Sequence, residues 1–338
     1  MRIHFWLFFC LCTLAVSEKI FAESKTSSAT ITNLQILEDK TGQLTLDDIL
    51  NHRYSGVFLP TSNPVNKGYS DSVFWLKFNL DNKVSPETLH YLKIDYSLDD
   101  LRFYYPNSDN TYESMHGGET IPQNKRDFQT RRTIFKFSTL SKSTHYLRVY
   151  NLNTIYVPIQ ILSDKELLAQ INMEQFLFGA YFGFFFIIFI YSLSIFSSIH
   201  DTKYLIYAFY LLTKGIQDLA SSHLLQLYIL SSTDGITNRK ITIFFLGLSF
   251  LFLTIFTFKS LSLNFLPKRI KLSIFITLGI LSTIESLSVF NFNFKFSLIP
   301  TIYFTLIFGV VFLLYRQSQH IKKNIQQYSF FGDGAFFS

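Results

Sequence analysis

The sequence contains very little cysteine. Only Cys10 and Cys12 occur among its 338 residues, and both lie inside the apolar run 5–16 near the N-terminus. A positively charged start precedes this run and a polar stretch reaching Ala22 follows it, which is typical of a secretory signal peptide cleaved after Ala22. An uncleaved anchor is the alternative. If residues 1–22 are removed, the mature protein has no thiol, which excludes disulfides and a cysteine-ligated metal.

Catalytic motifs are also missing. The sequence has no Gly-rich phosphate loop ending in Gly-Lys-Ser/Thr, no His-Glu-x-x-His and no Gly-x-Ser-x-Gly. Its 8 histidines are spread along the chain without the spacing of metal ligands. Lys and Arg (30) exceed Asp and Glu (24), yet no basic, aromatic-interleaved surface for nucleic acid stands out. We therefore predict a protein that is not an enzyme, uses no metal or cofactor and binds no nucleic acid.

Long apolar runs, in contrast, fill the C-terminal half. A helix needs about 20 mostly apolar residues to cross the ~30 Å hydrocarbon core of a bilayer. Five stretches meet or approach that length: 176–199, 204–230, 241–258, 272–290 and 296–315. We predict an α-helical transmembrane region over residues 176–327. A further stretch begins at residue 328 and the sequence ends at Ser338, so we expect residues 328–338 to be an incomplete sixth helix.

Residues 23–165 have a different pattern. Short runs alternate apolar with polar residues between turn clusters, which indicates half-buried antiparallel strands. These runs are 73–80, 91–96, 101–105, 133–137 and 146–150. About 140 residues with such strands predict an all-β sandwich or jelly roll that buries its own core. The expected fold class is a multidomain membrane protein, with this extracytoplasmic β-domain followed by an α-helical transmembrane bundle.

Residues 166–175 join the two regions without a Gly- or Pro-rich spacer. Leu167, Leu168 and Ile171 have helical spacing. This linker either is a stiff joint that transmits movement of the domain into the first membrane helix, or is a simple membrane-proximal cap. The sequence leaves both alternatives open.

The loop charges give the orientation. With the β-domain outside, eight Lys and Arg residues fall in cytoplasmic connections and three fall in the opposite loops. The eight are Lys203, Lys259, Lys268, Arg269, Lys271, Arg316, Lys322 and Lys323, and the three are Arg239, Lys240 and Lys295. This excess obeys the positive-inside rule and agrees with the signal peptide. We predict a multi-pass protein of the bacterial inner membrane with a periplasmic or extracellular N-terminal domain.

Two features of the predicted membrane helices carry structural hypotheses. Lys214 and Asp218 are four residues apart, so they share a helix face and can pair at bilayer depth. They form either a polar switch or a neutralised pair that orients the helix, and we favour the second. Gly179 and Gly183 form Gly-x-x-x-Gly, which lets another backbone approach. This motif serves either a homodimer or packing within the bundle, and again we favour the second.

A basic cluster is the candidate binding site of the β-domain. Lys125, Arg126, Arg131 and Arg132 follow a turn that contains two glycines. Such a cluster binds an anionic ligand or a sugar acid, or it is a solvated rim. Trp75, by contrast, alternates with apolar neighbours, so we expect it in the core rather than on a ligand platform.

Several short motifs together resemble one protein family. In the β-domain these are residues 44–49, 75–78 with Asn82, 117–122, Arg126, Arg131, Phe135 and 146–149. In the apolar half they are Gly179, Gly183, 191–193, Asp201, Tyr204, Leu205 and Tyr207. The sequence resembles bacterial seven-transmembrane receptors with diverse intracellular signalling modules (7TM-DISM), in the form with the second type of extracellular domain. The similarity runs from about residue 44 to residue 327.

The resemblance implies a jelly-roll domain similar to carbohydrate-binding modules, above seven helices that pass a signal to a cytoplasmic output. That output is usually a histidine kinase, a diguanylate cyclase, a nucleotide cyclase or a phosphatase. Within 338 residues the sequence has no such module and no seventh helix. We expect a C-terminally truncated product of an interrupted or partial gene, and the alternative is a five-helix receptor with a separate cytoplasmic signalling partner.

Two functions follow from these observations. The first is a membrane-bound sensory receptor for an extracytoplasmic small ligand, carbohydrate-like by the resemblance. The second is a non-sensing envelope protein, whose outer domain docks a protein partner while the helices serve as anchor and dimer interface.

Overall fold

The computed structural model describes residues 30–51, 57–81, 89–107, 109, 111–138, 143–152, 154–260, 269, 272–273 and 275–280. The predicted signal peptide, the fifth helix and the incomplete sixth helix lie outside these residues. The chain forms two compact units. We call Met1–Gly183 with Ser222–Asn238 the outer unit, and Phe184–Ser221 with Arg239–Ser338 the helical unit.

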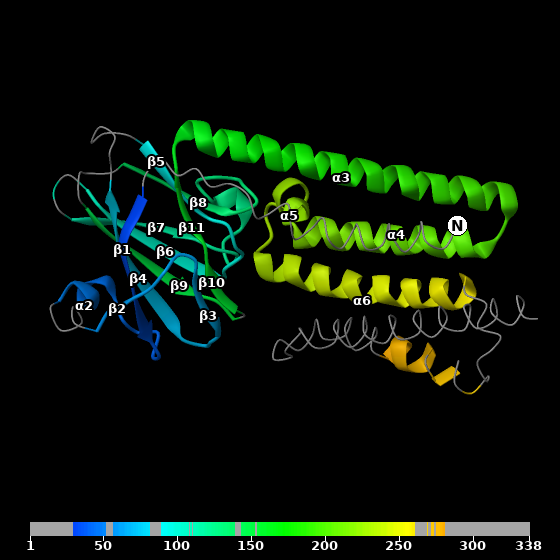
Figure 1. Cartoon of the computed structure of the whole chain (residues 1–338), viewed down its shortest axis with the longest axis horizontal. Helices are drawn as coiled ribbons and strands as arrows, with labels where there is room; N and C mark the ends of the chain where they lie inside the picture. Colours follow the sequence, from blue (N-terminus) through cyan, green and yellow to red (C-terminus); the bar gives the residue numbers. More distant parts are fainter. Residues whose placement is uncertain are drawn as a thin grey trace, which may run out of the picture. The chain divides into compact units, whose positions relative to one another are not determined.

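The outer unit is a β-sandwich of antiparallel strands (Figure 1). The six-stranded sheet has the order β2 (Leu59–Pro60), β1 (Thr30–Asp39), β4 (Val73–Asp81), β9 (Thr144–Tyr150), β6 (Asp100–Pro106) and β7 (Tyr112–Gly117). A three-stranded sheet has the order β11 (Ile159–Leu162), β5 (Leu89–Ile94) and β8 (Thr133–Ser138), and β10 (Thr154–Val157) pairs with β3 (Val65–Tyr69). Each of the five predicted strands is present, and the predicted sandwich is confirmed.

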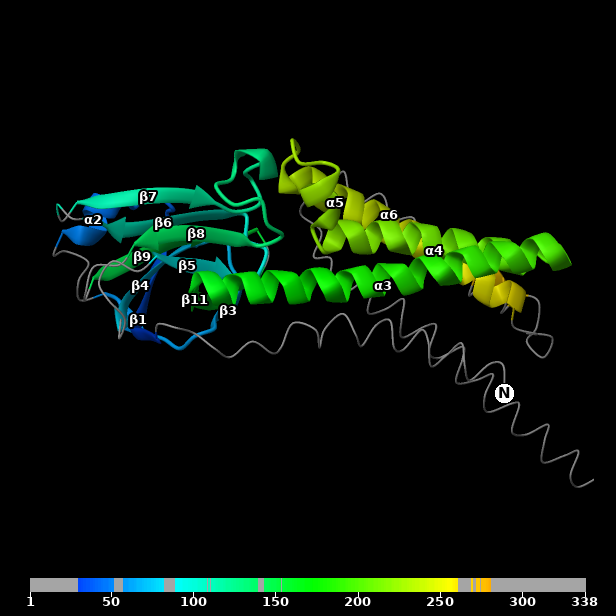
Figure 2. The same cartoon turned by 90° about the horizontal axis from the view of Figure 1, so that it is seen from above.

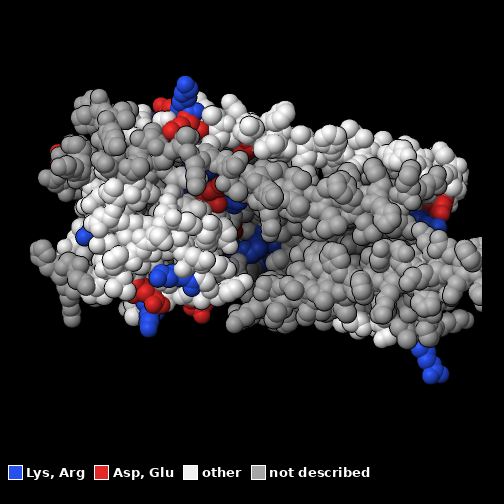
Figure 3. All heavy atoms as spheres, viewed as in Figure 1, with Lys and Arg blue, Asp and Glu red and all other residues white. Residues whose placement is uncertain are grey.

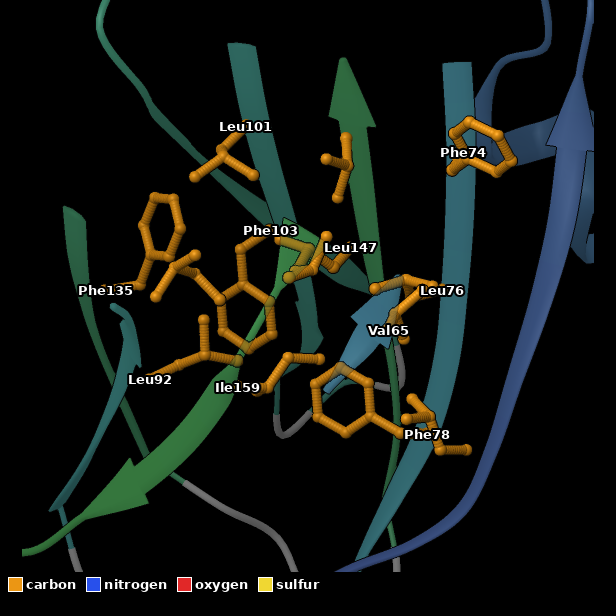
Figure 4. Packing of buried hydrophobic residues seen from close by; sticks show 14 of the residues in the cluster. Val65, Phe74, Leu76, Phe78, Leu92, Leu101, Phe103, Phe135, Leu147 and Ile159 are labelled. Atoms are coloured by element: carbon orange, nitrogen blue, oxygen red, sulfur yellow. The ribbon is translucent and has the colours of Figure 1, made fainter. Parts of the chain in front are cut away.

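The core lies between the sheets because alternate residues of each strand point inward. Phe74, Leu76 and Phe78 of β4 belong to one buried cluster, and Phe103 of β6 and Phe135 of β8 belong to the same cluster (Figure 4). Burying one side chain of this size contributes roughly 1.5–3 kcal/mol before entropy is subtracted. The apolar residues of the alternating runs in the sequence are therefore the residues that form the core.

The outward face of the six-stranded sheet is covered by a short helix, α2 (Leu46–Leu50). Thr45 and Asp48 form a capping box at its start. Ile49 of this helix packs in a second apolar cluster with Trp75, which is fully buried and stacks on Tyr104 with 5.6 Å between ring centroids. Trp75 is a core residue, as predicted, but it packs under α2 rather than between the sheets.

The outward face of the three-stranded sheet is covered by the first turns of α3 (Asp164–Ile199), which lie beside β5 and β11 (Figure 2). Leu167 is buried against Tyr91 and Ile134. Ser163 alone separates β11 from α3. The backbone N–H and the hydroxyl of Ser163 both donate to the Glu166 carboxylate at 2.8 Å. The predicted helical linker is therefore part of one long helix that starts on the sandwich.

The helical unit contains the rest of α3, α4 (Thr202–Ser221) and most of α6 (Gly235–Ser260). Residues 175–199 of α3 carry no charged side chain, and the visible surface beyond the first turns of this helix is white in Figure 3, whereas charged atoms lie where the helix begins. Within the described part of the chain, α3 and α6 are the two helices long and apolar enough to cross a membrane.

The predicted helix 204–230 differs from the structure. The chain leaves α4 after Ser221, adopts a left-handed conformation at His223 (φ 62°), and then forms a separate short helix, α5 (Leu224–Tyr228). Polar residues at this point end the helix, whereas the following apolar residues resemble its continuation in the sequence. Residues 222–238 belong to the outer unit, where they take part in the candidate site.

Candidate ligand pocket

The outer unit contains a pocket of about 290 Å³. Its walls come from the outward face of β5 and β8, the loop before β8, one side of α3 and the short helix α5. The lining residues are Lys93, Gln129, Thr130, Arg131, Arg132, Ile134, Ile171, Glu174, Gln175, Phe178, Leu224, Leu227 and Tyr228. This volume is at the small end of ligand-binding cavities in proteins.

A carboxylate from α3 is held by two cations of the sandwich. The Oε1 atom of Glu174 accepts a hydrogen bond from Lys93 Nζ at 2.8 Å. Its Oε2 atom accepts from Arg131 Nη2 at 2.8 Å and from Arg131 Nε at 3.2 Å. Lys93 also donates to the side-chain oxygen of Gln170 at 3.0 Å. Both carboxylate oxygens are thus bound by charge-assisted hydrogen bonds, which are the stronger kind.

Arg131 is in contact with α3 a second time, through an aromatic ring. Its guanidinium carbon lies 5.3 Å from the centroid of the Phe178 ring, within the range of a cation–π interaction. Phe178 is one helical turn beyond Glu174, so both residues occupy the same side of α3. Asp95 approaches Arg131 Nη2 at 4.0 Å from the other direction.

Arg132 is the third cation of the pocket. Its Nε lies 3.2 Å from Asp95 Oδ1, and its Nη1 donates to the Ser97 hydroxyl at 2.8 Å. Burial and the neighbouring Arg131 lower the pKa of Arg132 to about 10, so it is still charged at neutral pH. Among the charged residues that line the pocket, three are cations and only Glu174 is an anion. The pocket therefore favours a negatively charged guest.

Apolar side chains also line the pocket. Ile171 and Phe178 come from α3, and Leu224, Leu227 and Tyr228 come from α5. A guest in this pocket would meet both cations and apolar side chains.

The segment 222–238 is tied to the sandwich by hydrogen bonds. His223 Nε2 lies 2.7 Å from the Ser97 hydroxyl and 3.2 Å from Glu119 Oε1. The backbone N–H of Gly235 donates to the Glu119 carbonyl at 2.6 Å. A Cβ at Gly235 would lie 2.5 Å from the Glu119 Cβ, so this close approach requires glycine. Burial lowers the pKa of His223 to about 4, so the ring is neutral at neutral pH.

The predicted basic cluster separates into two pairs. Arg131 and Arg132 line the pocket, whereas Lys125 and Arg126 do not. Lys125 is exposed at the end of the short helix η2 (Gln123–Lys125). Arg126 donates from Nε to the Ile121 carbonyl at 3.0 Å, and its burial lowers its pKa. These contacts indicate that Arg126 stabilises the loop before β8 rather than binding a ligand.

The predicted features of the membrane helices have these positions. Lys214 and Asp218 form an ion pair in α4, and Lys214 Nζ also donates to Gln217 Oε1 at 2.7 Å. Among described atoms, none lies within 4 Å of a Cβ built on Gly179 or Gly183. No group of three potential metal ligands occurs among the described residues.

The architecture described so far is a β-sandwich followed by apolar helices, two of which are long enough to cross a membrane. Comparison with known families agrees. Residues 32–163 match the family described as 7TMR-DISM extracellular 2, and residues 174–330 match 7TM diverse intracellular signalling. The chain belongs to this family of seven-transmembrane receptors with diverse intracellular signalling modules. A comparison with curated proteins finds no match.

Proposed function

We propose that this receptor senses a small anionic ligand, which binds in the pocket of the outer unit. The observation that supports this most is the charge around the pocket, where the three cations Lys93, Arg131 and Arg132 exceed the two carboxylates paired with them, Glu174 and Asp95. Cations shielded from water interact with an anion more strongly than exposed cations do. A neutral ligand would leave that interaction unused.

A sugar acid is one ligand of this kind. The family resemblance suggests a carbohydrate-like ligand, and a carboxylate on a sugar would satisfy both that suggestion and the cations. Fold analogy alone does not identify a ligand, so the chemistry of the pocket is the stronger guide.

Binding would be communicated through α3. This helix lines the pocket with Glu174 and Phe178 and continues as one helix into residues 175–199, which are apolar enough to enter the membrane. A ligand changes the state of a receptor only if it binds one state better than another. A ligand that competes for contacts made by α3 has that property.

The remaining parts of the proposal come from the sequence. We propose a multi-pass protein of the bacterial inner membrane with the outer unit on the extracytoplasmic side. The basic connections would then face the cytoplasm, where a signalling module executes the response. A homodimer through Gly179 and Gly183 is the alternative to packing of these glycines within the bundle.

A melting screen of the full chain in lipid nanodiscs tests this function. The panel contains small carboxylates, sugar acids and phosphate, each with its neutral amide, alcohol or parent sugar. At about 100 times its Kd a ligand adds roughly 2.7 kcal/mol to the stability, which raises the melting temperature clearly. We expect anions to give this shift and their neutral partners not to.

Two variants make the screen specific for the pocket. Arg131→Ala should abolish the shift, whereas Arg102→Ala should keep it, because Arg102 is an exposed arginine on β6 outside the pocket lining. A panel in which no anion stabilises the protein would contradict the proposal. If crosslinking in cells then recovered a stable protein partner, the docking function predicted as the alternative would be supported.

A further inference from the structure

We propose that Glu174 is a built-in occupant of the carboxylate subsite, and that the ligand is a small monocarboxylate with an apolar body which replaces it. This inference rests on the proposed function, because it specifies the anion and the event that binding produces. It is carried by the positions of Lys93 and Arg131 around one carboxylate and by the apolar wall beside them.

The subsite has the geometry that a ligand carboxylate would need. Lys93 binds one oxygen of Glu174 at 2.8 Å, and Arg131 binds the other through two nitrogens at 2.8 and 3.2 Å. A free carboxylate has the same charge, size and acceptor positions as the Glu174 side chain, so it can make the same hydrogen bonds.

The solvent-exposed fractions of the side chains show which partner of this ion pair can leave. The side chains of Lys93 and Arg131 are 4% and 5% exposed, whereas that of Glu174 is 25% exposed. The cations are fixed in the sandwich, and the carboxylate approaches from the side that water reaches. Leaving buried cations without an anion costs several kcal/mol. Glu174 should therefore leave only when another anion takes its place.

The rest of the pocket determines what the carboxylate is attached to. Phe178, Ile171 and Leu227 line it beside the subsite, and about 290 Å³ has room for a compact body rather than a long chain. Apolar surface gains roughly 25 cal/mol per Å² on burial, which a sugar would not provide to the same extent. A ring or a short alkyl chain fits this wall best.

Replacement would alter the hold of the sandwich on α3. In the ligand-free protein α3 is attached by the apolar contacts of Leu167 and by the ion pairs of Glu174. With a ligand in the subsite the apolar contacts remain and the ion pairs are lost. The ligand thereby distinguishes two states of the helix that leads into the membrane.

Calorimetric titration of the full chain in nanodiscs tests the replacement, with benzoate and hexanoate as probes. Benzamide and hexanamide are the neutral controls, and glucuronate and phosphate are the anions without an apolar body. In the Glu174→Gln variant the internal competitor has no charge, so the probes should bind roughly tenfold or more tightly than to the wild type. Glu174→Asp should give an intermediate gain.

The control carboxylate is Glu113 on β7, which is bonded to Tyr105 and does not line the pocket. Glu113→Gln should leave probe binding unchanged, and Arg131→Ala should abolish it. Melting curves show which variants fold, and Glu174→Asp carries the test if Glu174→Gln does not.

Three results would overturn the inference. Equal affinity of wild type and Glu174→Gln for the probes would refute the internal competitor. Arg131-dependent binding of glucuronate or phosphate without binding of benzoate or hexanoate would refute the apolar body, while the proposed anion receptor would stand. If no anion bound any variant, the proposed function itself would fail.

Discussion

The two larger sheets of the outer unit each have a helix on their outward face, and the two helices are held by different interactions. Under α2 the contacts are apolar, with Trp75 and Ile49 at their centre. Under α3 an apolar contact at Leu167 is combined with the ion pairs of Glu174. Apolar packing is lost when its partner leaves, whereas an ion pair can be replaced by another ion of the same sign.

A hydrogen-bonded carboxylate on each side shows the same difference. Asp39 accepts hydrogen bonds from the backbone N–H groups of Thr41, Gly42 and Leu44, within its own loop. Burial opposes its ionisation, yet these bonds and that of the Thr41 hydroxyl outweigh it and lower the pKa of Asp39. Glu174 instead depends on cations from two other segments. The contacts under α2 are therefore permanent, and we call this the closed side. Under α3 the carboxylate can be exchanged for another anion, and we call this the exchangeable side.

The largest effect is expected on the closed side. Trp75→Ala removes a fully buried indole and leaves a cavity, so it should lower the free energy of unfolding by about 3–5 kcal/mol. Denaturant unfolding measures the loss, and Leu59→Ala, at a 65% exposed position, should change it by less than about 0.5 kcal/mol. A loss below about 1 kcal/mol for Trp75→Ala would contradict the packing under α2.

The next effect is expected at the ion pairs. Arg131→Ala leaves Glu174 with Lys93 alone and removes the contact with Phe178, so it should cost about 2–3 kcal/mol. The same unfolding measurement applies. Arg102→Ala should cost less than about 0.5 kcal/mol, because Arg102 is half exposed and lies 3.9 Å from its partner Asp100. Similar losses for both arginines would mean that burial does not strengthen the pair.

A pH-dependent effect is expected from His223. Its pKa falls from 6.5 in the unfolded chain to about 4 in the fold, so the unfolded chain binds the proton more tightly. The stability from this residue is complete above pH 6.5 and is lost as the pH falls towards 4. The slope of stability against pH measures the number of protons taken up on unfolding. In His223→Gln that number should be smaller by up to one.

His145 has its pKa lowered to about 4 by burial in the core, so part of the slope remains in His223→Gln. The double variant with His145→Gln should be flatter still. An unchanged slope in both variants would exclude His223 and His145 as its source.

The smallest effect compares the two carboxylates. Asp39→Asn places an amide N–H₂ against backbone donors and should cost about 1–2 kcal/mol. Glu174→Gln instead leaves Lys93 and Arg131 without their carboxylate, a loss that an added carboxylate can offset. Benzoate should raise the melting temperature of Glu174→Gln. It should not reduce the difference in melting temperature between Asp39→Asn and the wild type. Equal responses to benzoate would remove the distinction between the closed and the exchangeable side.

Much of the sandwich was predictable, because strands such as β4 and β9 contain runs in which apolar and polar residues alternate. β1 is harder to recognise, since its pairing with β4 shifts between Thr32 and Gln35 and breaks the alternation. β10 and β11 are short and are separated by Pro158, which interrupts the run. Strand length and bulges, rather than composition, limit what the sequence can indicate here.

The pocket was predictable only in part. Arg131 and Arg132 stand next to each other in a basic cluster, which is a local signal. In the sequence, Lys93 falls on the solvent side of an alternating strand, whereas in the structure it is buried and bonded to Gln170 and Glu174 of α3. The residues of α5 continue an apolar run, so the sequence assigns them to a membrane helix. Both errors come from long-range contacts, which no local pattern contains.

The contacts of α3 with the sandwich have one further consequence, which concerns helical phase. Leu167, Ile171, Glu174 and Phe178 are spaced by three or four residues, so they fall on one face of the helix. One residue inserted before Glu174 would turn that carboxylate by about 100° and withdraw it from Arg131. The contacts with the sandwich thus fix the rotation of α3 about its own axis. In the apolar stretch of α3, no charged side chain opposes such a rotation.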